Sequence, residues 1–350
     1  MAMKYGEAIK NGFRIINENW QLVMIQIAAM FASFAGFFIM VGIPLAIAFI
    51  IFGLDLTELS RIHDLLGTFQ KPSELISKYF GLVVLVLTSV LLYILIVLSL
   101  GVFVFGGSIG IIARSIKGDA GEFSFKEFFS EGKRLFFPLV GFTTVIGLIF
   151  VALAFILGLF GGAIAAIVSM AREQEATLAL FLGIFFSLIL LLVALSLILV
   201  TLAITIYGFA ALTIKGFGPV RSVKEATRHL YHHAGAFYLY CLVFGGYVII
   251  SFLLLFVGYP LKFVPFVGPL FAVVFQFFMH ISQNYFGLVM LATIFLYYFI
   301  TADDRQAAAV GQGIPEAPPA ISDNSSPERD ISESQVPGQG DAPPGKEESG

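Results

Sequence analysis

The chain has 350 residues, of which 58% are hydrophobic and only 12% are charged, and its mean hydropathy is +0.94. Soluble globular domains carry about 25% charged residues, so a chain with half that share cannot cover a water-facing surface. The composition therefore excludes an ordinary soluble protein and predicts an integral membrane protein. The net charge of −3 is a poor guide to binding partners, because the acidic excess lies in the C-terminal tail while the predicted inner loops are basic. Nothing in the sequence supports nucleic-acid binding.

Six long stretches of the chain contain no Asp, Glu, Lys or Arg. A helix needs about 20 apolar residues to cross the hydrocarbon core, so each stretch is long enough to span once. The sequence therefore predicts an all-α, polytopic bundle of six transmembrane helices, and it leaves open whether the last stretch is one tilted helix or a broken one. The stretches are residues 19–54, 79–113, 135–171, 176–214, 229–261 and 263–302.

The Lys and Arg residues between these stretches predict the orientation of the chain, because such residues are retained on the cytoplasmic side. The side that carries both termini is rich in them, and the opposite side has only five, namely Arg61, Lys71, Lys78, Arg172 and Lys262. We therefore predict a multi-pass protein of the cell membrane with both termini in the cytoplasm. The basic inner loops suit anionic lipid head groups.

Three segments on the predicted inner side have apolar residues at helical spacing and lead directly into a span: residues 5–20, 123–137 and 220–237. The second opens with Ser124 and Glu127 in capping-box spacing, and Pro219 before the third suits a first helical position. We interpret all three as amphipathic helices in the membrane interface.

Six basic side chains of these segments are predicted to contact lipid head groups: Lys126, Lys133, Arg134, Arg221, Lys224 and Arg228. Each segment precedes two spans, so units starting near residues 4, 122 and 219 indicate a possible threefold internal repeat. Glycines four apart, such as Gly106 with Gly110 and Gly158 with Gly162, predict close helix packing.

Two regions outside the spans are distinctive. Residues 55–78 form the one sizeable outer loop, for which we predict a short amphipathic cap. After Asp303 the composition changes to Pro, Gly, Ser, Asp and Glu, which cannot bury enough apolar surface to fold. The chain thus divides into a transmembrane domain, 1–303, and a disordered acidic cytoplasmic tail, 304–350, that is available to a protein partner.

A polar stripe in the last stretch is the best candidate for ligand binding. Gln276, His280, Gln283 and Asn284 share one helical face, and polar groups at membrane depth are costly unless paired or hydrated. Counting about 20 residues back from Asp303 places His280 near the outer interface, where these side chains are hydrated. The stripe therefore predicts either a ligand site or interfacial and helix-pairing residues.

Glu225, His229 and His233 form a weaker candidate, because carboxylate and imidazole groups one helical turn apart can bind zinc. The set lacks a cysteine, a second carboxylate and a partner helix, so a solvated face that gains charge at low pH is the alternative. The one cysteine, Cys241, lies within a span and supports neither a disulfide nor a metal site. We predict no cofactor.

Ser108 lies in Gly106-Gly107-Ser108-Ile109-Gly110, which matches the G-x-S-x-G pattern of serine hydrolases. That pattern works on a strained strand-to-helix turn, whereas this copy lies inside an apolar helix. Ser108 is placed near the inner end of its span and His280 near the outer end, so the two cannot form a catalytic pair. An intramembrane hydrolase is a remote alternative.

The segments Phe105–Phe142 and Gly216–Phe237, with Tyr297-Tyr298, resemble the inner loops of uncharacterised six-span prokaryotic membrane families. The pattern is similar to the membrane domain joined to some glycerophosphodiester phosphodiesterases. The resemblance implies architecture and no activity, because this chain carries no soluble phosphodiesterase domain.

We expect a non-enzymatic accessory or organising protein that binds lipid or a protein partner. The alternative is a facilitative transporter or lipid-handling permease with a cavity between the helix repeats, lined in part by Gln276, His280 and Gln283. Charged residues are absent from the spans, which argues against an ordinary ion-coupled pump.

Overall fold

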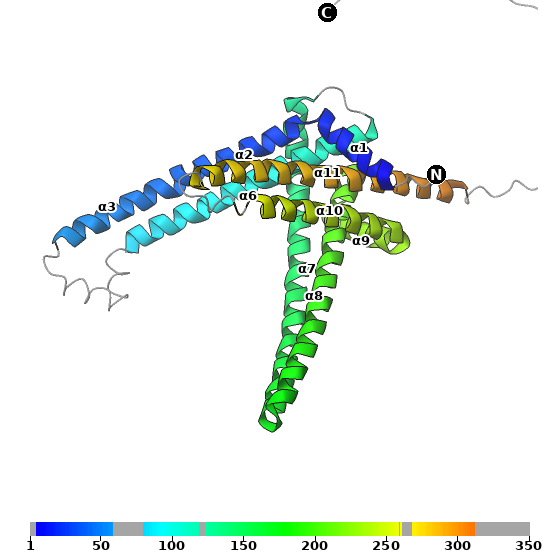
Figure 1. Ribbon diagram of the computed structural model, residues 1–350. Coiled ribbons are helices and arrows are strands. Elements are labelled where there is room, and N and C mark those ends of the chain that lie inside the picture. Colours follow the sequence, from blue (N-terminus) through cyan, green and yellow to red (C-terminus); the bar gives the residue numbers. More distant parts are fainter. Residues whose placement is uncertain (1–4, 59–79, 119–122, 259, 261–267, 312–350) are drawn as a thin grey trace, which may run out of the picture. The chain divides into compact units, whose positions relative to one another are not determined.

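The computed structural model describes residues 5–58, 80–118, 123–258, 260 and 268–311, and every regular element in those ranges is helical (Figure 1). The all-α prediction is therefore confirmed for this part of the chain. The elements are α1 (Tyr5–Glu18), α2 (Gln21–Phe37), the π-helical segment η1 (Phe38–Gly42), α3 (Ile43–Glu58), α6 (Phe80–Lys117), α7 (Phe125–Gln174), α8 (Ala176–Lys215), α9 (Pro219–His232), α10 (Ala234–Gly258) and α11 (Gly268–Gly311).

Six helices within the described ranges are long and apolar enough to cross a membrane. The first combines α2, η1 and the start of α3, and the others are α6, α7, α8, α10 and α11. This confirms a multi-pass membrane protein. The described part of the last stretch, from Gly268 to Ala302, is one unbroken helix, although the sequence had left a broken helix open.

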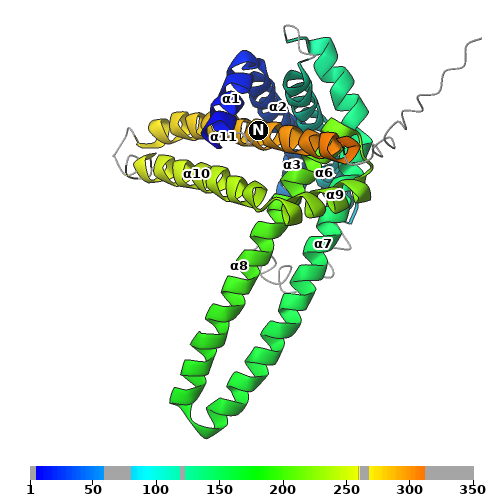
Figure 2. The same cartoon turned by 90° about the vertical axis from the view of Figure 1, so that its right-hand side faces the viewer.

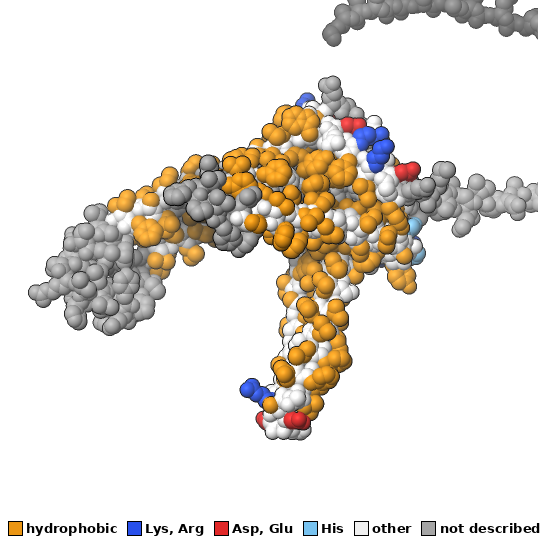
Figure 3. All heavy atoms as spheres, viewed as in Figure 1, with side chains coloured by type: hydrophobic (Ala, Val, Ile, Leu, Met, Phe, Trp, Pro, Cys, Tyr) orange, Lys and Arg blue, Asp and Glu red, His pale blue; other side chains and the backbone are white. Residues whose placement is uncertain are grey.

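The spans expose most of their apolar side chains. Leu91 of α6, Phe155 of α7 and Leu191 of α8 are 67%, 67% and 62% exposed. In Figure 3, hydrophobic side chains cover the visible surface of the α7–α8 hairpin, and charged side chains appear at its tip. An apolar surface of this extent requires lipid around it, since water would make it aggregate.

The buried core lies at one end of three spans, the end that carries Lys117 in α6, Lys215 in α8 and Ala302 in α11. We call this region the inner core and define it by the buried residues of Val104–Ala113 in α6, Ala203–Ile214 in α8 and Leu288–Ala302 in α11. Helix α1, the first turns of α7 and helix α9 pack against it.

Glycines bring α6 and α7 together at the inner core. A Cβ added to Gly107 would lie 2.6 Å from Cε2 of Phe128, and one added to Gly110 would lie 2.6 Å from Cβ of Glu131. The predicted packing role of Gly106 and Gly110 therefore holds for α6. By contrast, a Cβ at Gly158 or Gly162 of α7 would meet nothing within 4 Å in the described part of the chain.

Helix α7 differs from the prediction at its start. It runs unbroken from Phe125 to Gln174 through Pro138, so residues 125–137 of the predicted segment belong to the span helix and do not form a separate helix. Ser124 precedes the helix but its side chain makes no capping hydrogen bond. Glu127 instead pairs with Arg114 of α6 at 3.1 Å, because this cation lies across the helix interface.

The ends of several elements follow local sequence signals. Pro219 is the first residue of α9, as predicted. Lys117 and Lys215 end α6 and α8, and each is followed by a glycine at positive φ, 78° for Gly118 and 65° for Gly216. Only glycine adopts this left-handed conformation without strain, so both helices stop there and the chain turns. Figure 2 shows α7 and α8 side by side as a hairpin, followed by α9.

Two predicted regions lie outside the described residues. Helix α3 continues to Glu58, and the rest of the predicted outer cap, 59–78, is not described. Helix α11 continues past the predicted boundary at Asp303 as far as Gly311, and the chain divides into compact units between Gln306 and Ala307. Residues 312–350 of the predicted tail are not described.

Candidate functional site

Two pockets lie between α2 and α11 and share Met30 and His280. We call them together the α2–α11 crevice. The first, about 430 Å³, is also bordered by α6 and contains Gln26, Ser33 and Asn284. The second, about 540 Å³, is apolar except for Gln276 and His280, and its other lining residues are Met30, Phe31, Phe34, Ala272, Val273 and Phe277. Both volumes fall within the roughly 300–1,000 Å³ of ordinary ligand pockets.

The polar side chains of the first pocket have unused hydrogen-bonding capacity. Within the described part of the chain, Gln26, His280 and Asn284 make no side-chain hydrogen bond to another residue. Ser33 donates to the carbonyl oxygen of Ala29 in its own helix at 2.8 Å. Polar groups that lack partners in an apolar medium cost free energy, so these side chains suit a ligand that supplies the missing partners.

The crevice places His280 opposite the middle turns of α2. At a rise of about 1.5 Å per residue, Gln26 and Ser33 lie roughly 8 and 18 Å along α2 from its first residue, Gln21. His280 faces this part of α2. Its position near the outer interface, counted back from Asp303, stays a prediction.

The structure brings part of the predicted polar stripe into the crevice. Gln276, His280 and Asn284, at intervals of four residues, line it, and Gln283 lines neither pocket. Sequence reasoning missed Gln26 and Ser33. These two residues are seven positions apart, about two helical turns, and therefore lie on one face of α2. This spacing could have indicated them from the sequence.

His229 of α9 packs against the inner core and is only 1% exposed. Its ring centroid lies 5.4 Å from that of Tyr207 in α8 and 4.9 Å from that of Tyr298 in α11. Its Nε2 lies 3.4 Å from Oγ1 of Thr301, whose hydroxyl hydrogen is donated to the carbonyl oxygen of Tyr297 at 2.7 Å. Which of the two atoms donates in this contact depends on the tautomer of the imidazole ring.

The weak metal candidate is not assembled. His229 and His233 stack at 4.9 Å between ring centroids, but no three His, Cys, Asp or Glu side chains in the described ranges form a group that could hold a metal ion. Glu225 therefore does not complete a site with the two histidines. The pair is explained by packing between α9 and its neighbours.

The surroundings of Ser108 are those of a residue in a helix-packing surface. It is fully buried and its Oγ donates to the carbonyl oxygen of Val104 in the same helix at 2.9 Å. Its neighbours Gly107 and Gly110 are in contact with Phe128 and Glu131 of α7. The G-x-S-x-G match thus describes a helix-packing surface, with no strained turn that would present a nucleophile.

The six predicted head-group contacts are all exposed, namely Lys126, Lys133, Arg134, Arg221, Lys224 and Arg228. Arg134 also pairs with Glu131, with 2.6 Å between Nη2 and Oε2. The guanidinium of Arg221 lies over the Phe217 ring at 4.2 Å from its centroid. The other four side chains are exposed and form no ion pair or cation–π contact within the described part of the chain.

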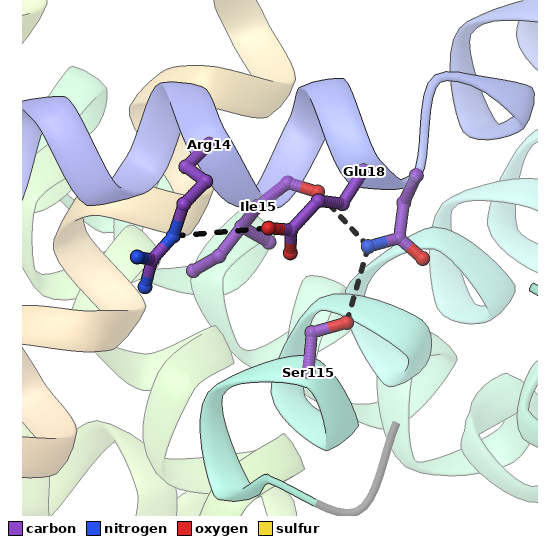
Figure 4. Close-up of polar contacts among 5 residues, drawn as sticks. Arg14, Ile15, Glu18 and Ser115 are labelled. Carbon is purple, nitrogen blue, oxygen red and sulfur yellow. Dashed lines mark hydrogen bonds and ion pairs between the residues drawn. The ribbon is translucent and has the colours of Figure 1, made fainter. Parts of the chain in front are cut away.

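Polar contacts join α1 to two spans. Nδ2 of Asn19 donates to the carbonyl oxygen of Ile15 at 2.9 Å and to Oγ of Ser115 in α6 at 3.2 Å (Figure 4). On α11, the hydroxyl of Tyr285 donates to Oδ1 of Asn17 at 2.7 Å. These bonds fix α1, and with it the start of α2, beside the crevice.

Together the fold and the crevice define an all-α, multi-pass membrane protein with a part-polar, part-apolar pocket between its spans. Comparisons with protein-family models, curated protein sequences and solved structures found no match to this chain. Function must therefore be argued from the residues themselves.

Proposed function

We propose that this protein is a non-enzymatic, lipid-binding membrane protein that holds one amphipathic lipid in the α2–α11 crevice. The observation that carries the proposal is the pairing of the two pockets at His280. One pocket is apolar enough for an acyl chain, and the other presents unpaired amide and imidazole groups. Surrounding lipid is the natural supply of such a molecule.

The chemistry of the crevice favours an uncharged polar group on that lipid. Gln26, His280 and Asn284 can both donate and accept hydrogen bonds, and no Lys, Arg, Asp or Glu lines either pocket. Ester carbonyls and hydroxyls match these groups. A fully ionised group would be poorly compensated at this depth.

The experiment is native mass spectrometry of the full chain after gentle extraction. We expect the wild type to retain a lipid of defined mass and His280→Leu/Asn284→Leu to lose it. Gln283→Leu is the matched control, because Gln283 lies on the same helix outside both pockets. Equal retention in all three proteins would refute lipid binding in the crevice.

A facilitative permease is the alternative use of the same crevice. It requires a path to both sides, whereas α11 is packed into the inner core from Leu288 to Ala302, next to the crevice. This closure favours holding a lipid over conducting one. Reconstituted vesicles separate the two functions: transfer of labelled lipid between leaflets by the wild type, abolished in the double variant, would establish the permease.

We further propose that α1, the first turns of α7 and helix α9 lie in the cytoplasmic membrane interface, with both termini inside the cell. Their exposed basic side chains support this placement. An accessory role, in which the acidic tail recruits a protein partner, belongs to the same proposal. This role is inferred from the basic charge of the three segments and from the composition of the tail.

A threefold internal repeat is part of the proposal and is supported by matching positions. Gly12 with Arg14, Gly132 with Arg134 and Ala226 with Arg228 each combine a buried small residue with an exposed arginine two positions later.

Contacts of the three segments repeat as well. Each segment reaches the second span of the preceding unit: α1 contacts Thr293 of α11, α7 contacts Phe103 of α6, and α9 contacts Tyr207 of α8. Such a cyclic order is what three related units closing into a ring would produce.

A further inference from the structure

A second, basic pocket of about 320 Å³ lies where the inner ends of α6, α8 and α11 meet. Lys117 and Lys215 line it, together with Phe217 and with Tyr298 and Ala302 of α11. It shares no lining residue with the α2–α11 crevice. We call it the two-lysine pocket.

The two lysines occupy equivalent places in the chain. Ser115-Ile116-Lys117-Gly118 and Thr213-Ile214-Lys215-Gly216 are closely similar, and both end a span with a glycine at positive φ. Each lysine is therefore the last residue before the same kind of helix stop. The fold brings both copies of this feature to one pocket.

The lysines do more than neutralise helix ends. Each helix C-terminus carries roughly −0.5 of an elementary charge, so the ends of α6 and α8 offset about one of the two positive charges. Among the described side chains, no carboxylate lines the pocket. Among these described groups a positive charge is left, which suits an anion.

Donor groups are also available. Nζ of Lys117 donates to the carbonyl oxygen of Ile214 at 2.8 Å, and Nζ of Lys215 lies 5.8 Å from the centroid of the Tyr298 ring. An ammonium group has three N–H donors, so Lys117 keeps donors beyond that bond. Phosphate oxygens accept charge-assisted hydrogen bonds from such groups.

The position of the two lysines along their spans favours a lipid head group as the source of the anion. Lys117 and Lys215 mark the ends of the apolar parts of α6 and α8, where hydrocarbon gives way to head groups. We propose that Lys117 and Lys215 jointly bind the phosphate group of an anionic phospholipid. The inference does not depend on the lipid in the crevice.

The test titrates the full chain, in a nonionic detergent, with phosphatidylglycerol or with phosphatidylcholine of the same acyl chains, and counts bound lipid by native mass spectrometry. Lys117→Gln/Lys215→Gln should bind phosphatidylglycerol at least about tenfold more weakly, since each basic group near an anionic head group contributes about 1 kcal/mol. Arg172→Gln removes an exposed positive charge at the tip of the α7–α8 hairpin, away from the pocket and from the predicted head-group contacts, and should leave the affinity nearly unchanged. Weakening in Arg172→Gln equal to that in the lysine variant would overturn the proposal.

Inorganic phosphate distinguishes the two sources of the anion. We expect excess phosphate to leave phosphatidylglycerol bound. Displacement of the lipid by phosphate in the wild type would overturn the head-group assignment and show that the pocket takes the free ion. His280→Leu/Asn284→Leu should keep the preference for phosphatidylglycerol over phosphatidylcholine, which separates failure of this site from failure of the crevice.

A measurement on the wild type covers the case in which the lysine variants do not fold. Phosphatidylglycerol should protect Lys117 and Lys215 from an amine-reactive reagent more than phosphatidylcholine does, as read by peptide mass spectrometry. Equal labelling of Lys117 and Lys215 in the two lipids would refute the proposal.

Discussion

Gly12 of α1 is packed against Thr293 of α11, so closely that a Cβ at residue 12 would lie 3.1 Å from the backbone nitrogen of Thr293. Thr293 is itself fully buried. The first helix of the chain thus contacts the last span at a point where only a glycine fits. This contact joins the N-terminal segment to the inner core.

Gly12→Ala should destabilise the protein by about 1–3 kcal/mol, because the added methyl group overpacks the contact with Thr293. The measurement is the midpoint of thermal unfolding in detergent. Gly6→Ala is the control, since a Cβ there meets nothing within 4 Å and alanine favours the helix by about 0.5–1 kcal/mol. An unchanged midpoint for Gly12→Ala would show that α1 does not pack on α11 as described.

Arg134→Ala should destabilise the protein by about 1–2 kcal/mol, because it leaves the largely buried carboxylate of Glu131 without its ion pair. Arg134 is itself exposed, and solvent screening keeps the effect modest. Lys133→Ala, the neighbouring exposed cation, should change the stability by less than about 0.5 kcal/mol. Adding Glu131→Gln to Arg134→Ala should recover part of the loss in a double-mutant cycle, and strict additivity would contradict the coupling.

His229→Ala should cost about 2–4 kcal/mol, because it opens a cavity between Tyr207 and Tyr298 in the inner core. His232→Ala should have a small effect, since His232 is exposed. Zinc should not raise the unfolding temperature of the wild type. A zinc-dependent rise in the unfolding temperature that disappears in His229→Ala would show that His229 binds zinc after all.

Reporter fusions test the predicted orientation. Alkaline phosphatase joined after Glu175, at the tip of the α7–α8 hairpin, should be active, because that enzyme matures only outside the cytoplasm. The same reporter after Gly216 should be inactive, and green fluorescent protein should show the reverse pattern. Activity only after Gly216 would invert the topology and with it the placement of the basic segments in the cytoplasmic interface.

Sequence composition by itself determined the class of the protein and the number of spans. A chain with so few charged residues must place its apolar surface in lipid, and the gaps between charges mark where each span ends. Local signals also located particular helix ends, as Pro219 shows at the start of α9. These features depend on neighbouring residues alone, so they can be read without tertiary contacts.

The tertiary structure alone decided which residues meet. It showed that Gln26 and His280 line one crevice, that the two SIKG-like segments end at one pocket, and that Glu127 pairs with Arg114 instead of capping its helix. In lipid the apolar pattern surrounds a helix almost uniformly, so hydrophobicity does not indicate which face a helix turns to its neighbour. Close contacts at small residues fix those faces, and they exist only after the helices have packed.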